Sequence, residues 1–125
     1  MRETPTAQIA LNDTGIVCVR IRPNAGQSLV DAQENLGFAL LERDGVKRPL
    51  LVDIRVAQPL DAEVRHYYSG QVLVDGFSAL GLLVDASPLG RMMGNVYFRV
   101  ARPGIPARLF TDEAQATSWL RQQAE

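Results

Sequence analysis

The sequence predicts an α/β protein with a mixed, mostly parallel sheet, and two observations carry this prediction. Near the N-terminus, two short apolar segments flank an Asn-Asp-Thr-Gly turn, which is typical of a β-hairpin. After them, short continuous apolar segments alternate with segments whose apolar residues recur at helical spacing. Such alternation predicts parallel strands joined by right-handed helical crossovers. We expect the order β-β-α-β-α-β-α-β-α, with about five strands and four helices in one domain over residues 1–125.

The hairpin and the first helix account for the N-terminal third of the chain. Residues 7–11 and 16–21 are the expected strands of the hairpin. Ser28 is the expected N-cap of the first helix, with Asp31 at N3 facing the positive helix end. Gly45 follows the last turn and is expected to end the helix. The apolar stripe of this helix consists of Leu29, Ala32, Leu36 and Leu40.

The middle of the chain contains two segments that we expect as buried strands. Residues 50–54 are short, continuous and apolar, the pattern of a strand that is buried on both faces. Residues 77–84 have the same pattern. Between them, a second helix is expected to begin at Pro59-Leu60-Asp61. The residues expected on one side of it are Val64, Tyr67, Tyr68 and Val72.

A third helix, a last strand and a final helix complete the predicted fold. Ser87 is expected to cap the third helix, with Pro88 at its first position, where a missing N–H costs nothing. This helix should end before Arg102-Pro103-Gly104. Residues 107–110 are the last strand, and Thr111 is the expected cap of the final helix. In that helix Asp112 and Glu113 occupy the first turn, and Trp119 and Leu120 face inward.

Composition excludes several classes of protein. The net charge of −1 provides no basic field for nucleic acid. Cys18 is the only cysteine, which excludes an intramolecular disulfide and a cysteine-based zinc cluster, and its apolar surroundings predict a buried structural thiol. No stretch approaches the roughly 20 apolar residues of a membrane span, and residues 1–6 have no apolar signal core. We therefore expect a cytoplasmic protein.

Three segments carry a family resemblance. They are residues 50–54 (LLVDI), residues 83–91 (LVDASPLGR) with Gly94-Asn95 following, and residues 107–111 (ARLFT). Together with the order of elements, they resemble the STAS domain of sulfate transporters and anti-sigma-factor antagonists, and more closely the SpoIIAA-like bacterial proteins, often labelled STAS/SEC14-like. By topology the resemblance extends over nearly the whole chain. It implies a SpoIIAA-like fold and a regulatory, protein-binding role.

The resemblance also implies a phosphorylation loop, and this chain lacks a serine at the corresponding place. Asp85-Ala86-Ser87-Pro88-Leu89-Gly90 looks like the Asp-Ser-Ser-Gly-Leu-Gly loop of the anti-sigma-factor antagonists. In that family the loop follows the first strand after the first helix, which here is residues 50–54. The corresponding position is Leu60-Asp61-Ala62, which contains no Ser or Thr. We therefore interpret Ser87 as a helix cap, and we favour plain capping by Asp61 over mimicry of a phosphate charge.

Two carboxylates fall where ligands bind in open α/β sheets. Asp53 and Asp85 both lie at the carboxyl ends of predicted parallel strands. Two such carboxylates could hold Mg²⁺ together with waters. Because no phosphate-binding glycine loop accompanies them, we favour the interpretation that each accepts hydrogen bonds from loop amides. Asp85, His66 and Ser87 show no triad spacing, although triads assemble in space rather than in sequence, and we expect no catalytic residue. We also expect no metal and no cofactor.

The third helix is the surface on which we expect a partner or ligand. Gly90 and Gly94 lie four residues apart, which suggests close approach by another backbone, a subunit or a ligand. Arg91, Asn95 and Arg99 follow the same spacing and could bind an anionic partner, although a solvated helix face is the favoured interpretation. Apolar residues surround most of this helix. The full candidate surface is Asp53, Asp85, Ser87, Gly90, Arg91, Gly94, Asn95 and Arg99.

These features predict a non-catalytic regulatory or protein-interaction module. The alternative is a small-ligand or lipid-binding domain of SEC14-like type that uses the third helix, and an enzyme using Asp53 and Asp85 with a divalent cation is a third hypothesis. A homodimer is also expected, because the hairpin leaves an exposed sheet edge and the Gly90/Gly94 face permits close helix packing.

Overall fold

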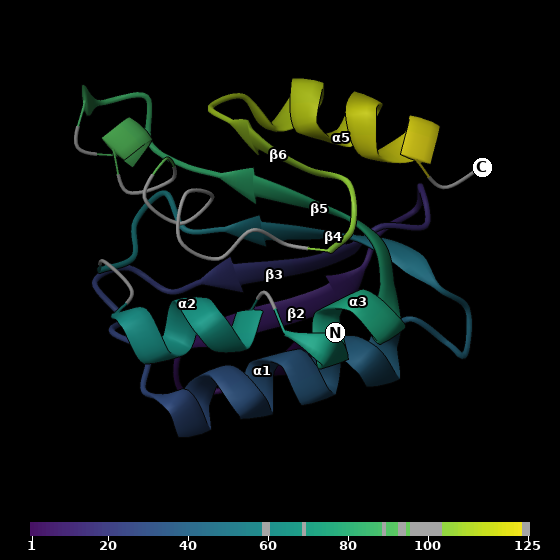
Figure 1. The fold of residues 1–125 in the computed structure, drawn as a ribbon, viewed down its shortest axis with the longest axis horizontal. Coiled ribbons are helices and arrows are strands. Elements are labelled where there is room, and N and C mark those ends of the chain that lie inside the picture. The colour runs from purple at the N-terminus through teal and green to yellow at the C-terminus, as the bar shows by residue number, and fades with distance from the viewer. Residues whose placement is uncertain (59–60, 69, 89, 93–94, 96–103, 124–125) are drawn as a thin grey trace.

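A computed structural model shows a six-stranded mixed sheet with helices on both of its faces (Figure 1). The structure describes residues 1–58, 61–68, 70–88, 90–92, 95 and 104–123. The strands are ordered β1-β2-β3-β4-β5-β6, and the pairs β3–β4, β4–β5 and β5–β6 are parallel. The predicted α/β class and the mixed, mostly parallel sheet are therefore confirmed.

The N-terminal side of the sheet is antiparallel and contains one strand more than expected. The hairpin strands are β2 (Ala7–Leu11) and β3 (Val17–Ile21), and β1 (Arg2–Glu3) pairs with β2. Two charged residues have no apolar pattern, so the sequence did not predict β1. This short charged strand pairs with Gln8 and Ile9 and so covers part of the edge that we expected the hairpin to expose. Short charged edge strands discourage pairing with a second chain.

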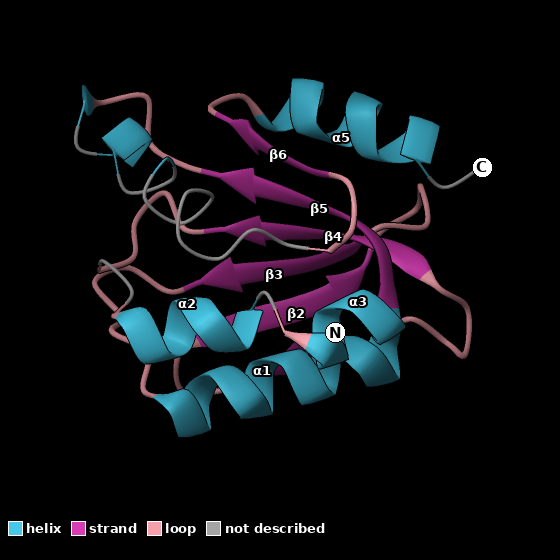
Figure 2. Cartoon of the chain, in the orientation of Figure 1, coloured by secondary structure: helices cyan, strands magenta, loops and turns pink. Residues whose placement is uncertain are grey.

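The parallel strands are β4 (Arg48–Asp53), β5 (Phe77–Leu83) and β6 (Ala107–Phe110). Together with β3, they end on the same side of the molecule, which Figure 2 shows as a row of arrowheads. We call this side the carboxyl edge. It brings together the chain segments that follow each parallel strand, including the start of α5 (Glu113–Gln123).

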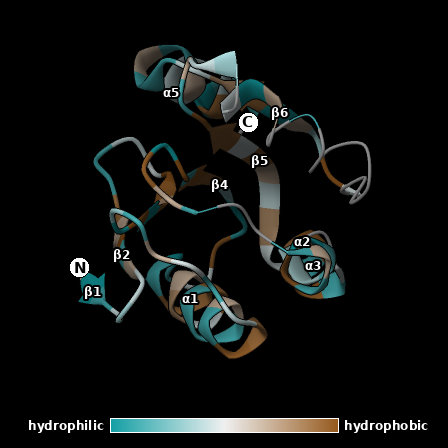
Figure 3. Cartoon of the chain, turned by 90° about the vertical axis from the view of Figure 1, so that its left-hand side faces the viewer, coloured by the Kyte–Doolittle hydropathy of each residue, from teal (hydrophilic) through white to brown (hydrophobic). Residues whose placement is uncertain are grey.

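Helices α1 (Leu29–Glu42), α2 (Ala62–Tyr68) and α3 (Gln71–Gly76) pack on one face of the sheet, and α5 packs on the other (Figure 3). The sheet has one hydrophobic core on each face, and adjacent strand residues pack into opposite cores because side chains alternate along a strand. Leu50 and Leu51, for example, are both buried but belong to different clusters. Burial on both faces explains why the parallel strands read as continuous apolar runs.

The expected second helix is interrupted. Gly70 is the N-cap of α3, so α2 and α3 are separate helices. The break changes the buried face, because Leu73 is buried while Val72, which we expected on the same side as Val64, is 39 % exposed. Asp61 caps α2 as expected, accepting a hydrogen bond from the Val64 amide at 3.2 Å.

Both predicted ends of α1 are confirmed, and the predicted cap of α5 is wrong by one residue. Ser28 and Asp31 form a reciprocal capping box at α1, and Gly45 takes a positive φ of 75° after it. The final helix begins one residue later than expected. Asp112, not Thr111, caps α5, since its side chain accepts a hydrogen bond from the Ala114 amide at 3.1 Å.

Ser87 caps the start of the predicted third helix. Its Oγ accepts a hydrogen bond from the Gly90 amide, and its carbonyl accepts one from the Arg91 amide, both at 3.1 Å. The rest of this predicted helix falls largely outside the described residues. The positions outside include Leu89, Met93, Gly94 and Arg99.

Candidate functional site

A groove of about 250 Å³ opens at the carboxyl edge, between the segments that follow β4 and β5. The segment after β4 contributes Arg55 and Val56, and the turn after β5 contributes Asp85, Ser87 and Gly90. Asn24, on the loop after β3, completes this side of the groove. The structure thus brings together three of the predicted site residues at the place where open α/β sheets bind ligands.

The turn that forms one wall of the groove is stabilised by its own polar groups. Asp85 Oδ1 accepts a hydrogen bond from the Ser87 amide at 2.9 Å. A Cβ at Gly90 would lie 2.4 Å from the Asp85 carbonyl oxygen, so this position requires glycine. The close backbone approach that we expected at Gly90 therefore comes from the preceding turn of the same chain.

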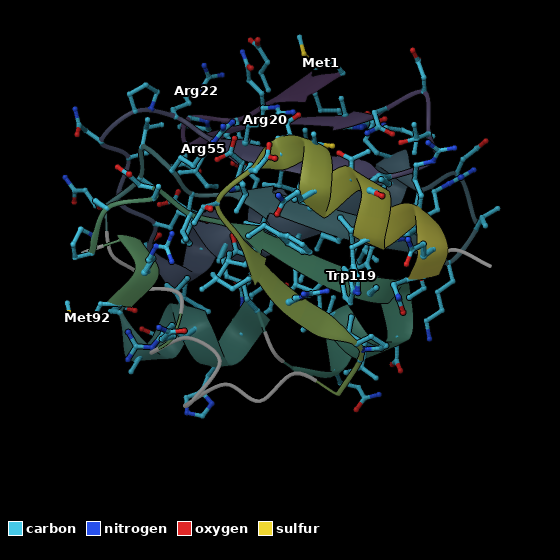
Figure 4. The ribbon with its side chains drawn as sticks, turned by 90° about the horizontal axis from the view of Figure 1, so that it is seen from above. Met1, Arg20, Arg22, Arg55, Met92 and Trp119 are labelled. Atoms are coloured by element: carbon cyan, nitrogen blue, oxygen red, sulfur yellow. The ribbon has the colours of Figure 1, made fainter. Side chains whose placement is uncertain are left out.

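Asp53 lies at the same edge but faces α5, where it takes part in an ion network with Arg20, Arg55 and Glu113. Its Oδ2 accepts hydrogen bonds from Arg20 Nη1 at 2.9 Å and Arg55 Nη2 at 2.8 Å. Glu113, the first residue of α5, binds Arg20 Nη2 at 2.6 Å and Arg55 Nη2 at 3.2 Å. Figure 4 shows the two arginines side by side near the start of α5. The network thus joins the ends of β3 and β4 to this helix.

The electrostatics of this network keep all four groups charged. Burial of Asp53 opposes its ionisation, but the hydrogen bonds and charge of Arg55 outweigh burial and hold its pKa below the usual range. The hydrogen bond from Arg20 likewise lowers the pKa of Glu113, and the same contact raises the pKa of Arg20. Two carboxylates and two guanidiniums therefore balance each other at neutral pH.

Asp53 and Asp85 are both engaged in the way that we favoured. Each accepts a hydrogen bond from a loop amide two residues further on, Arg55 for Asp53 at 3.1 Å and Ser87 for Asp85. Among the described residues, no group of three or more His, Cys, Asp and Glu side chains is placed to hold a metal ion.

The predicted surface on the third helix is described only in part. Arg91 and Asn95 are exposed, and Arg91 Nε donates a hydrogen bond to the Ala86 carbonyl at 3.3 Å. Met92, between them, has 56 % of its surface exposed. Gly94 and Arg99 lie outside the described residues.

On the face covered by α1, α2 and α3, the structure buries a polar cluster that the sequence analysis missed. The Asn35 side chain is fully buried and donates hydrogen bonds to Thr6 Oγ1 at 2.8 Å and Gln27 Oε1 at 3.1 Å. The Tyr68 hydroxyl also donates to Gln27, and burial raises the pKa of Tyr68. Asn35 interrupts the apolar stripe of α1, and this was the only signal in the sequence.

Cys18 is buried as expected, with 7 % of its surface exposed, and burial raises the pKa of its thiol. A thiol with a raised pKa forms little nucleophilic thiolate. The structure thus supports a packing role for Cys18. In the described part of the chain, no helix combines the length and the hydrophobicity needed to cross a bilayer.

Comparison with known proteins identifies the fold. The model of a family described as Domain of unknown function (DUF7793) matches residues 9–124. The chain is also similar to the crystal structure of an uncharacterized protein from the DUF3478 family with a SpoIIAA-like fold, from Shewanella loihica PV-4. That similarity has a TM-score of 0.59 and 14 % identity, and it covers 96 % of this chain and 98 % of the other. It shows the SpoIIAA-like fold that the sequence resemblance implied. No curated protein matches the chain.

Proposed function

The chain belongs to the DUF7793 family, and we propose that it is a non-catalytic, regulatory protein-interaction module that binds a protein partner at the carboxyl-edge groove. One observation carries the proposal. Val56 and Arg55 lie in the wall of the groove and are exposed, Val56 to 53 %, and the exposed residues Arg91 and Met92 directly follow the groove residue Gly90 in the chain. Methionine and arginine are enriched at protein interfaces, where apolar contacts are surrounded by polar ones.

The state of the carboxylates supports a binding role over a catalytic one. A general base works best with a pKa near the operating pH, and burial or like charges usually raise carboxylates toward it. Asp53 has the opposite shift, because two arginines hold it in its charged form. Asp85 and Ser87 are used to build the turn. These side chains therefore serve the architecture of the edge.

The size of the groove favours a protein partner over a small ligand or lipid. Pockets that enclose a small molecule usually measure about 300–1,000 Å³. The carboxyl-edge groove, at about 250 Å³, falls below that range and is lined by loops that follow the strands. A side chain or two from a protein surface would fill it.

Site-specific photo-cross-linking tests the proposal with a matched control. Val56 and Val46 have similar exposure, 53 % and 51 %, but Val46 lies in the connection from α1 to β4, at the other end of the parallel strands. A benzophenone amino acid is placed at either position, and the protein is irradiated in a lysate of its source cells. We expect a discrete protein adduct from position 56 and none from position 46.

Substitutions at the same two positions then test whether the partner binds at the groove. Val56→Asp should weaken binding of the identified partner more than about tenfold, the effect of losing one well-buried contact of roughly 1.4 kcal/mol, while Val46→Asp leaves it unchanged. Equal adducts from both positions, or a chain that floats with liposomes and yields no protein adduct, would contradict the proposal and favour the lipid-binding alternative.

The homodimer and the cytoplasmic location remain predictions. The edge on which the first argument for a dimer rested is covered in part by β1, which weakens that argument, and the second argument rests on the face of the third helix. Light scattering that gives a mass near 13.7 kDa would contradict the dimer.

A further inference from the structure

The last strand of the sheet is β6, and no strand among the described residues pairs with its outer edge. Its inner edge pairs with β5, where the Pro106 and Phe110 carbonyls accept hydrogen bonds from the Leu80 and Val84 amides, both at 2.9 Å. Backbone groups point alternately to the two sides of a strand. Ala107 and Leu109 therefore direct their N–H and C=O groups away from β5. Among the described residues, no strand lies beyond them.

A groove of about 270 Å³ runs beside this edge, between β6 and α5. Phe110 and Trp119 form its aromatic floor, and their ring centroids lie 5.7 Å apart. The Arg108 guanidinium lies 5.6 Å above the Phe110 ring and forms one side of the groove. The α5 side is neutral and polar, with Gln115, Ser118 and Gln122.

From this arrangement we infer that β6 and the groove beside it bind an extended, acidic peptide segment of a partner protein, which adds a seventh strand to the sheet. Peptides that pair with an exposed sheet edge gain affinity from backbone hydrogen bonds and specificity from pockets for alternate side chains. Here Ala107 and Leu109 supply the backbone groups. Every second side chain of the peptide would then project into the groove.

Charge indicates which peptide fits. Among the described residues that line the groove, Arg108 is the only charged one. Of the two acidic residues at the start of α5, Glu113 is already bound by Arg20 and Arg55, and Asp112 caps the helix through its Oδ1. An acidic side chain opposite Arg108 and an apolar one on Trp119 therefore complement this surface.

The same charge argues against a second copy as the occupant. In antiparallel pairing of two β6 strands, the register that uses both outward residues of each copy places Ala107 of one copy opposite Leu109 of the other. That register sets Arg108 directly opposite its own copy, and like charges in that position are destabilising. The β6 surface is also separate from the carboxyl-edge groove, so the inference stands or falls independently of the proposed function.

The test begins with a phage-displayed library of random heptapeptides, selected against the full chain. We expect enriched peptides that alternate apolar and other residues and that carry at least one Asp or Glu. The best peptide is then synthesised unmodified and in two forms that are N-methylated at alternate residues, one form in each frame. Only one frame faces β6 in an added strand. Methylation in that frame should weaken binding more than about tenfold, as expected for losing two or more hydrogen bonds, and methylation in the other frame should not.

Two readouts on the protein locate the peptide. Trp119 is the only tryptophan, so its fluorescence should change on titration with the unmodified peptide. Exchange of the Ala107 and Leu109 amides with solvent should be fast in the free chain and slow at least about tenfold with saturating peptide. Arg108 is exposed, so Arg108→Glu should fold normally and select basic instead of acidic peptides, while Arg121→Glu on α5 keeps the original preference.

Several results would overturn the inference. They are the absence of any enriched peptide, equal binding of the two N-methylated forms, and unchanged exchange at Ala107 and Leu109 in the complex. Slow exchange of these two amides in the free chain, together with a dimeric mass in light scattering, would show that a second copy occupies the edge instead. Should Arg108→Glu not fold, the N-methylated peptides still decide the question on the unmodified chain.

Discussion

The two faces of the sheet accommodate polar groups beside their cores in opposite ways. On the α1–α3 face, Gln27, Asn35 and Tyr68 are buried as neutral side chains that bond to one another. On the α5 face, the polar groups are ions held at the rim, with the side chains of Arg20 and Arg55 still 38 % and 39 % exposed. The first arrangement excludes water, and the second remains in contact with it.

The two faces should therefore differ in how strongly their stability depends on salt and pH. Neutral hydrogen bonds inside a protein are little affected by salt, whereas exposed ion pairs are screened by it and respond to pH. The ion network joins α5 to the ends of β3 and β4, and α5 also forms one side of the β6 groove. High salt or low pH should therefore weaken the packing of α5 before it affects the α1–α3 face.

The largest expected effect tests the core under α1–α3. Phe77 is fully buried in this core, so Phe77→Ala should lower the free energy of unfolding by about 3–5 kcal/mol, through lost burial and a residual cavity. Leu120→Ala is the corresponding truncation to alanine in the smaller core under α5. Urea denaturation gives both values, and hydrogen exchange shows where each acts. If Leu120→Ala speeds exchange in α1 as much as in α5, the two cores are not separable.

The second effect tests the ion network. Asp53→Asn should cost about 2 kcal/mol, because breaking a buried ion pair costs about 3–5 kcal/mol and the exposure of both arginines reduces the loss here. The control is Asp85→Asn at the end of the neighbouring strand, where Oδ1 is retained and a loss below about 1 kcal/mol is expected. Denaturation in low salt measures both, and equal losses would show that Asp53 is only another loop cap.

A smaller effect tests the neutral cluster. Tyr68→Phe removes the hydroxyl that donates to Gln27 and should cost about 1 kcal/mol. Its cost should be the same in 0.05 and 1 M NaCl, whereas the cost of Asp53→Asn should shrink in the higher salt. A salt-dependent loss in Tyr68→Phe would remove the distinction between the two faces.

The smallest effect is a difference in acid sensitivity. The pKa values of Asp53 and Glu113 are lower in the folded chain than their ordinary values, so the unfolded chain binds more protons between about pH 5 and pH 3. The stability from these groups is complete at neutral pH and is lost as the pH falls through that window. Unfolding midpoints from pH 7 to pH 3 should drop more steeply for the native chain than for Asp53→Asn. Parallel curves would contradict a lowered pKa at Asp53.

Local patterns were sufficient for most of the secondary structure. The hairpin, the capping box at Ser28 and Asp31, the parallel strands and the Ser87 cap all depend on neighbouring residues, so the sequence predicts them. The errors have equally local causes. Arg2 and Glu3 carry no apolar signal for β1, and one glycine, Gly70, divides a helix that periodicity alone made continuous.

The candidate site was predictable only in part. Asp53 ends one predicted strand, and Asp85, Ser87 and Gly90 follow the next, which places them at the carboxyl edge. Their partners were not predictable, because Arg20 lies 33 residues from Asp53 and 93 from Glu113 along the chain. The one signal was a charged residue in an otherwise apolar strand, which marks an unusual position without naming what it contacts.

What the sequence determined by itself was therefore the class of fold and the edge where its polar turns gather, because burial and capping leave periodic traces in neighbouring residues. Only the tertiary structure decided the rest. It paired Arg20 and Arg55 with Asp53 and Glu113, assembled the neutral cluster around Asn35, and left β6 at the outer edge of the sheet beside Trp119. These are contacts between distant segments, and their energies depend on distances that exist only once the chain has folded.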